Sequence, residues 1–247
     1  MRNIPTAVKH LLIINILIFV ADFVLQMRGT FDLGSLFGLW SFDVPATNPY
    51  GHFHFWQPLT YMFMHGNFTH IFFNMYALWM FGSVMESHWG TRRFLVYYFA
   101  CGIGAGLLYM LVPGMHVTIG ASGAIYGLLL AFAMYFPKDR VYIFIWMFVL
   151  MAASLVLNGV QIPALQRIGA LIDEYSVFLF LLIFFLGQNG KGLVPIQNRW
   201  FIVIMTAIEL FMGIFIIDGI AHFAHLGGML IGLLIILWWR KHPFSRI

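Results

Sequence analysis

A serine and a histidine stand out because each lies at the start of a predicted helix that is rich in small residues. Ser122 lies in the sequence Gly-Ala-Ser-Gly, and His225 is followed closely by two glycines. A serine hydroxyl is a poor nucleophile until a base takes its proton, and an imidazole can be that base. The same imidazole can afterwards protonate a leaving amine. The pair therefore predicts hydrolysis of an amide bond, provided that the fold brings the two side chains together.

Further polar groups fit the stabilisation of an oxyanion. Ser122 is predicted at a helix N-terminus, where backbone N–H groups lack partners within the helix and the dipole is positive. His70 and Asn74 are four residues apart, so they share one helix face. Together with the Ser122 N–H, they are candidates to stabilise the negative charge of a tetrahedral intermediate.

The orientation of His225 is expected to come from packing alone. Tyr126 lies one turn after Ser122, and its ring is the predicted neighbour of the imidazole, so no carboxylate is required. Glu209 lies in the middle of the preceding apolar run and is interpreted as a protonated, hydrogen-bonded packing residue. His222 lies about one turn before His225, and its role is open between the site and the lining of a water cavity.

These residues belong to a chain whose composition indicates a membrane protein. Of its 247 residues, 62% are hydrophobic and 9% are charged, whereas roughly 25% are charged in soluble domains. This composition argues against a water-soluble enzyme and against a nucleic-acid partner. Because a spanning helix needs about 20 apolar residues, we expect six core helices, at about 11–27, 57–85, 94–112, 119–136, 200–217 and 220–239.

An insertion at about 141–193 separates the fourth and fifth of these runs. It contains two shorter apolar runs, 141–157 and 176–187, which predict an extra hydrophobic hairpin between core helices 4 and 5. With the N-terminus in the cytoplasm and both of these runs counted as crossings, only Arg28 and Arg167 of the 13 Lys and Arg residues face outward, as the positive-inside rule requires. We therefore predict an all-α polytopic membrane protein, one domain over 1–247, with both termini cytoplasmic.

Depth in the membrane provides a geometric test of the proposed site. At 1.5 Å per residue, Ser122 and His225 lie about 21 Å and about 22 Å from the inner ends of their helices. Asn74 and His70 lie at about 18 Å and about 24 Å, on either side of that level. Small residues four apart follow both Ser122 and His225, which favours close helix packing. Ser122 Oγ is therefore expected within hydrogen-bond reach of His225.

At these residues the chain resembles the rhomboid intramembrane serine proteases. Four motifs agree in type and in order: His65-x4-His70-x3-Asn74, Glu86-x3-Gly90, Gly120-Ala121-Ser122-Gly123, and Ala224-His225-Leu226-Gly227-Gly228 with Gly232 beyond. The resemblance covers the six core helices, which is most of the chain outside the insertion.

The resemblance implies a rhomboid-like six-helix core and a catalytic dyad of Ser122 and His225. It implies an oxyanion site that includes His70 and Asn74, beside the Gly120 motif, and a Tyr126 ring packed on His225. Single-span transmembrane proteins would be the substrates, and the lipid bilayer would be the surroundings. No cofactor and no metal are implied. A bacterial inner membrane is the expected location.

The chain departs from the family pattern at two places, and other functions remain open. Gln57 stands after Trp56 where many relatives have arginine, and the insertion at 141–193 has no assigned role. One alternative is a non-catalytic, rhomboid-like protein that binds membrane clients. Another is a metal-dependent enzyme or transporter that uses histidine ligands, here His65, His70, His222 and His225.

Overall fold

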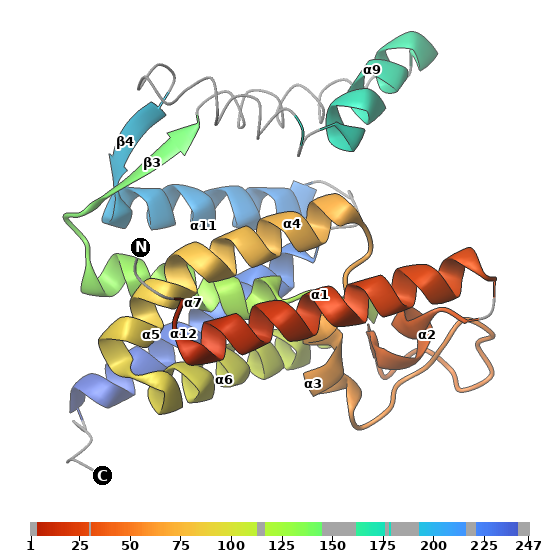
Figure 1. Ribbon diagram of the computed structural model, residues 1–247, viewed down its shortest axis with the longest axis horizontal. Helices are drawn as coiled ribbons and strands as arrows, with labels where there is room; N and C mark the ends of the chain where they lie inside the picture. Colours follow the sequence, from red (N-terminus) through yellow and green to blue (C-terminus); the bar gives the residue numbers. More distant parts are fainter. Residues whose placement is uncertain are drawn as a thin grey trace. The chain divides into compact units, whose positions relative to one another are not determined.

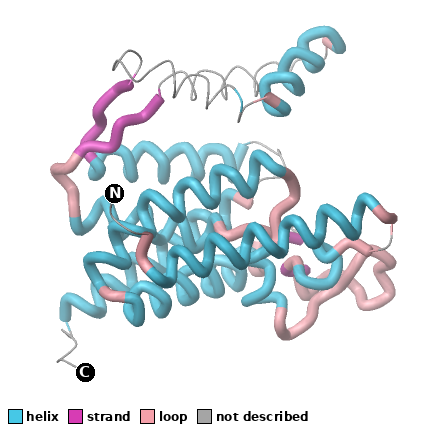
Figure 2. Tube along the Cα trace, viewed as in Figure 1, coloured by secondary structure: helices cyan, strands magenta, loops and turns pink. Residues whose placement is uncertain are grey.

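In the residues that it describes, the computed structural model is mostly helical, with two short two-stranded sheets (Figures 1 and 2). It describes residues 4–29, 31–112, 117–144, 162–175, 178, 193–215 and 221–241. The elements are α1 (Thr6–Met27), α2 (Leu33–Phe37), β1 (Leu39–Trp40), α3 (Gln57–Thr60), a 3-10 turn (Tyr61–Phe63), α4 (Phe68–Ala77), a π segment (Leu78–Gly82), α5 (Ser83–Trp89), α6 (Thr91–Tyr109), β2 (Val117–Thr118), α7 (Ser122–Tyr135), β3 (Arg140–Phe144), α9 (Pro163–Glu174), β4 (Leu193–Gln197), α11 (Asn198–Phe215) and α12 (His222–Lys241).

Three of the described helices are long and apolar enough to cross a membrane: α1, α11 and α12. The helix α7 is apolar but shorter. Large apolar side chains such as Leu17, Val20 and Phe23 lie exposed on α1, as expected of a surface that faces lipid rather than water. The prediction of an α-helical polytopic membrane protein is confirmed, whereas the number of six core helices remains a prediction.

The second expected span, 57–85, is wrong as one continuous helix. The chain forms α3 and a 3-10 turn, leaves the helical conformation at 64–67, and starts again at Phe68 in α4. The side chain of Asn67 causes this restart, because its Oδ1 accepts a 2.8 Å hydrogen bond from the His70 N–H, the interaction that makes asparagine a good N-cap. His65 therefore precedes the helix that carries His70 and Asn74.

Glu86, on α5, fastens the beginning of α1. Its two carboxylate oxygens accept hydrogen bonds from the Ala7 N–H at 2.9 Å and the Val8 N–H at 2.8 Å. The Thr91 hydroxyl donates a third bond, at 2.7 Å. A negative group at a helix N-terminus satisfies unpaired donors and complements the helix dipole. Glu86 thus has a structural role at the start of α1.

The helices α6, α7 and α12 pack side by side (Figure 1), and glycines allow their close approach. A Cβ on Gly228 of α12 would lie only 1.8 Å from the Gly123 carbonyl oxygen of α7. A Cβ on Gly127 would lie 2.7 Å from Cys101 Sγ of α6. The expected packing through small residues is therefore present, and it brings the first turns of α7 and α12 together.

The region between α1 and α4 is held by a buried amide. Gln57 Oε1 accepts hydrogen bonds from the Trp40 N–H at 3.2 Å and the His54 N–H at 3.0 Å. Its Nε2 donates to the carbonyl oxygens of Leu36 and His52 at 3.1 Å and 3.0 Å. All four partners are backbone groups, so the Gln57 side chain ties this loop together.

The chain divides into two compact units, one of residues 1–137 and 202–247 and the other of residues 138–201. In the second unit β3 pairs with β4 in antiparallel register, with Arg140 opposite Gln197. The first residues of the predicted apolar run 141–157 are therefore a strand and not the start of a helix. The rest of that run lies outside the described residues, and so does 176–187 except for Phe178. The predicted hairpin and the single domain over 1–247 remain predictions.

Candidate active site

Ser122 is the first residue of α7, as expected, and the segment before it is fixed on both sides. The strand β2 pairs with β1, with Thr118 opposite Leu39. The Gly120 N–H donates a 2.8 Å hydrogen bond to the Tyr61 carbonyl oxygen. Gly120 has a φ of +120°, a conformation that favours glycine because it has no Cβ. The turn therefore holds Ser122 at a defined position on the free N-terminus of the helix.

The side chains of Ser122 and His225 meet between α7 and α12. Ser122 Oγ lies 2.9 Å from His225 Nε2, within the range of a good hydrogen bond. The Tyr126 ring stacks on the imidazole, with ring centroids 4.2 Å apart and an angle of 8° between the planes. The imidazole is thus packed on one face and directed at the serine hydroxyl at its edge.

The expectation that packing alone orients His225 is wrong, because Glu209 contacts the imidazole. Its Oε2 lies 2.9 Å from His225 Nδ1 and 2.7 Å from His222 Nδ1. The Tyr126 hydroxyl donates a hydrogen bond to its Oε1. Glu209, His222 and His225 are buried, and Tyr126 is partly buried. Glu209 is therefore not simply a packing residue, because its carboxylate links the histidines and the tyrosine of the site.

His70 and Asn74 lie against the turn that precedes Ser122. A Cβ on Gly120 would be 2.7 Å from His70 Nε2 and 3.7 Å from Asn74 Nδ2. Asn74 is buried, and its Nδ2 has no hydrogen-bond partner among the described residues. A buried amide without a partner is costly, and it is therefore a candidate donor to a substrate oxygen. The roles of both residues remain predictions.

The four histidines of the metal alternative do not form one cluster in the described part of the chain. The potential ligands that gather there are Glu209, His222 and His225. His65 is buried and makes a ring contact with His70, with centroids 5.0 Å apart. The set with four histidines therefore separates into two pairs, and the pair on α12 is accompanied by a carboxylate.

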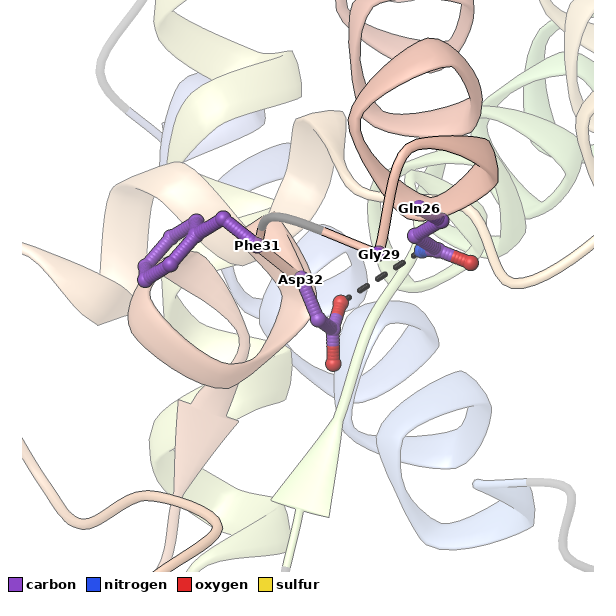
Figure 3. A pocket seen from close by; sticks show the side chains of 4 residues that line it. All are labelled: Gln26, Gly29, Phe31 and Asp32. Carbon is purple, nitrogen blue, oxygen red and sulfur yellow. Dashed lines mark hydrogen bonds between the residues drawn. The ribbon is translucent and has the colours of Figure 1, made fainter.

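Two surface pockets of the described residues lie away from Ser122 and His225. One is lined by Gln26, Gly29, Phe31 and Asp32, which follow or end α1 (Figure 3). The Gln26 amide reaches the Asp32 carboxylate at 3.5 Å across it. A second pocket is lined by residues of the segment 31–54. Neither Ser122 nor His225 lines either pocket. The chemistry of the buried cluster, and not a surface cavity, therefore identifies the candidate site.

Glu209 and His222 are the residues whose contacts sequence reasoning missed. The available signal was the carboxyl group itself, since ionisable residues inside a membrane helix usually mark function. No spacing rule relates Glu209 to His225, because they belong to two different helices. Only their contact in the fold gives the carboxylate a partner.

Comparison with protein families gives a match to the Rhomboid domain over residues 52–173. This segment, about half of the chain, contains His70, Asn74 and Ser122 but ends before Glu209 and His225. The assignment of His225 therefore rests on the geometry of α12.

Similar proteins come from plants and bacteria. The chain is 33% identical to the chloroplastic rhomboid-like protein 11 of Arabidopsis thaliana over 119 residues, which are 48% of this chain and 38% of that protein. It is 40% identical to the rhomboid protease GluP of Bacillus subtilis over 74 residues, 30% of this chain and 14% of that one. The longest of these matches, to the rhomboid protease GlpG of Photorhabdus laumondii, has 26% identity over 197 residues, 79% of this chain and 51% of that one. The chain thus spans about half or less of the length of these relatives.

Proposed function

The chain belongs to the rhomboid family, and we propose on this premise that it is an intramembrane serine endopeptidase. Ser122 is the nucleophile and His225 the general base. The substrates are single-span membrane proteins, cleaved within or beside the transmembrane segment. The enzyme resides in a bacterial inner membrane with both termini in the cytoplasm.

The 2.9 Å contact between Ser122 Oγ and His225 Nε2 carries this proposal. A serine at a helix start is usually an N-cap, or bonds back to its own helix. Here the N-cap position is occupied by Ala121, so Ser122 is not the cap of α7. The Ser122 hydroxyl instead meets an imidazole that is 103 residues away in sequence. The arrangement is that of a nucleophile and its base.

The reaction follows from this geometry in two stages. His225 Nε2 takes the hydroxyl proton as Ser122 Oγ attacks the scissile carbonyl carbon, and a C–O bond forms. His225 then gives the proton to the leaving amine, the C–N bond breaks, and an acyl-enzyme remains. In the second stage His225 takes a proton from water as the water oxygen bonds to the ester carbon. His225 then returns a proton to Ser122 Oγ as the ester C–O bond breaks, which releases the acid product and restores Ser122.

The oxyanion formed in each stage needs donors beside Ser122. The Ser122 N–H begins α7 and points out of the helix. His70 and Asn74 lie against the Gly120 turn. We assign these three groups to the oxyanion site, where a single donor contributes about 100-fold to 1,000-fold in rate.

A fluorophosphonate probe and a transmembrane substrate together test the proposal. Purified wild type, Ser122→Ala and His225→Ala are compared for covalent labelling and for cleavage. We expect wild type alone to react in both assays. Cleavage by Ser122→Ala at the wild-type rate would refute the assignment. Folded wild-type protein that neither labels nor cleaves, but binds membrane clients, would identify the non-catalytic alternative.

A further inference from the structure

The carboxyl group of Glu209 lies within hydrogen-bond distance of three side chains. His225 Nδ1 and His222 Nδ1 both approach Oε2, at 2.9 Å and 2.7 Å. The Tyr126 hydroxyl approaches Oε1. Glu209 is 4% exposed, His222 6% and His225 7%, so little water competes for these contacts. A buried carboxyl group with three donors around it is a connected polar network, which holds its members in fixed positions.

This network determines which nitrogen of His225 carries the proton. An ionised carboxylate only accepts hydrogen bonds, and a neutral imidazole donates from one nitrogen and accepts at the other. If Nδ1 donates to Glu209, Nε2 presents its lone pair, and Ser122 Oγ lies 2.9 Å from that atom. The other tautomer would turn an N–H toward the serine hydroxyl and could not take its proton.

We propose that Glu209 is a positioning residue that extends the Ser122–His225 pair to a Ser–His–Glu triad. This inference rests on the proposed protease function and deepens it. The carboxylate fixes the tautomer of His225 and faces the positive charge that the imidazole gains when it takes the serine proton. An opposite charge in a site that excludes water stabilises that state more than it would in water.

His222 and Tyr126 hold Glu209 in turn. His222 shares the oxygen that faces His225, whereas Tyr126 uses the other oxygen and also stacks on the His225 ring. Oε2 therefore contacts His222 as well as His225, and Oε1 contacts Tyr126. The carboxylate cannot turn away from His225 without breaking one of these bonds.

The same groups are potential metal ligands, but their spacing favours hydrogen bonds. The imidazole nitrogens lie 2.7 Å and 2.9 Å from Glu209 Oε2. Ligand atoms around a tetrahedral zinc ion, each about 2.0–2.1 Å from the metal, are about 3.3 Å apart. The observed distances are those of charge-assisted N–H···O bonds. Because the same three groups could also bind a metal ion, the experiment includes a test for metal.

The test compares Glu209→Gln, Glu209→Asp and Glu209→Leu in the full chain. Thr206→Val on the same helix is the matched control, because among the described residues its hydroxyl bonds to the Ile202 carbonyl oxygen and the Met229 sulfur and not to the site. The readouts are kcat and KM for a transmembrane substrate, the rate of fluorophosphonate labelling, and the 15N NMR shifts of the histidine rings.

We expect Glu209→Leu to lower kcat and the labelling rate strongly, by up to about 10,000-fold, which is the loss when the carboxylate that orients a catalytic histidine is replaced. KM should change by less than about twofold, because Glu209 acts on the imidazole and not on substrate binding. Aspartate should restore part of the rate, glutamine less, and Thr206→Val should match wild type. The NMR shifts should show His225 with its proton on Nδ1 in wild type and a mixture of tautomers in Glu209→Leu.

Three results would overturn the inference. Wild-type kcat in folded Glu209→Leu and Glu209→Gln, with Ser122→Ala inactive, would refute the triad and leave the protease function intact. Stoichiometric metal in the wild type, with activity lost to a chelator, would assign Glu209 to a metal site. An active Ser122→Ala would refute the protease function itself, whatever Glu209 does. If Glu209→Leu fails to fold, the near-isosteric glutamine variant decides between these outcomes.

Discussion

Gly228→Ala should separate the two helices that carry the serine and the histidine. An ideal Cβ at this position would lie 1.8 Å from the Gly123 carbonyl oxygen, whereas carbon and carbonyl oxygen approach to about 3.3 Å at closest. The helices α7 and α12 must therefore move apart by about 1.5 Å, which lengthens the 2.9 Å contact between Ser122 and His225 beyond hydrogen-bond reach. Overpacking of this kind costs about 1–3 kcal/mol of stability.

The loss of activity should exceed the loss of stability. Removing the contact with the base should slow fluorophosphonate labelling by at least about 100-fold, measured on protein that remains folded by circular dichroism and gel filtration. Gly227→Ala is the matched control, because its Cβ would meet its nearest atom, Ala105 Cα, at 3.2 Å and needs only a small adjustment. Wild-type labelling in folded Gly228→Ala would refute the reasoning that glycine packing sets the distance between Ser122 and His225.

Two further substitutions test the elements around the site. Glu86→Ala leaves two buried N–H groups at the start of α1 without their carboxylate, so it should lower the free energy of unfolding by about 2–3 kcal/mol; an unchanged melting temperature in detergent would contradict this. Gly120→Ala adds a Cβ 2.7 Å from His70 Nε2 at a residue with a φ of +120°. It should reduce kcat by about 100-fold through displacement of an oxyanion donor, and wild-type kcat in folded protein would exclude His70 from that role.

Local patterns in the sequence account for several features of the fold. Apolar runs predict the helices α1, α6, α7, α11 and α12 to within a few residues, because the bilayer sets the length of an apolar run and its composition. The run at 57–85 is the exception. Hydropathy does not detect the break at 64–67, since it depends on one side-chain bond from Asn67 to the backbone of His70. The strand β3 was missed for a related reason: it is defined by its partner β4, about fifty residues later.

Residue type and helical spacing alone predict which groups are reactive and how deep they lie. Ser122 begins a helix, His225 lies near the start of another, and glycines four apart permit the two to pack closely, so their contact followed from spacing and helical rise. The partners of Glu209 were decided only by the tertiary structure. Its carboxylate meets His225, His222 and Tyr126 because α11 packs beside α7 and α12 at a particular rotation. Helix rotation depends on the packing of many side chains at once, and no local spacing in the chain records it.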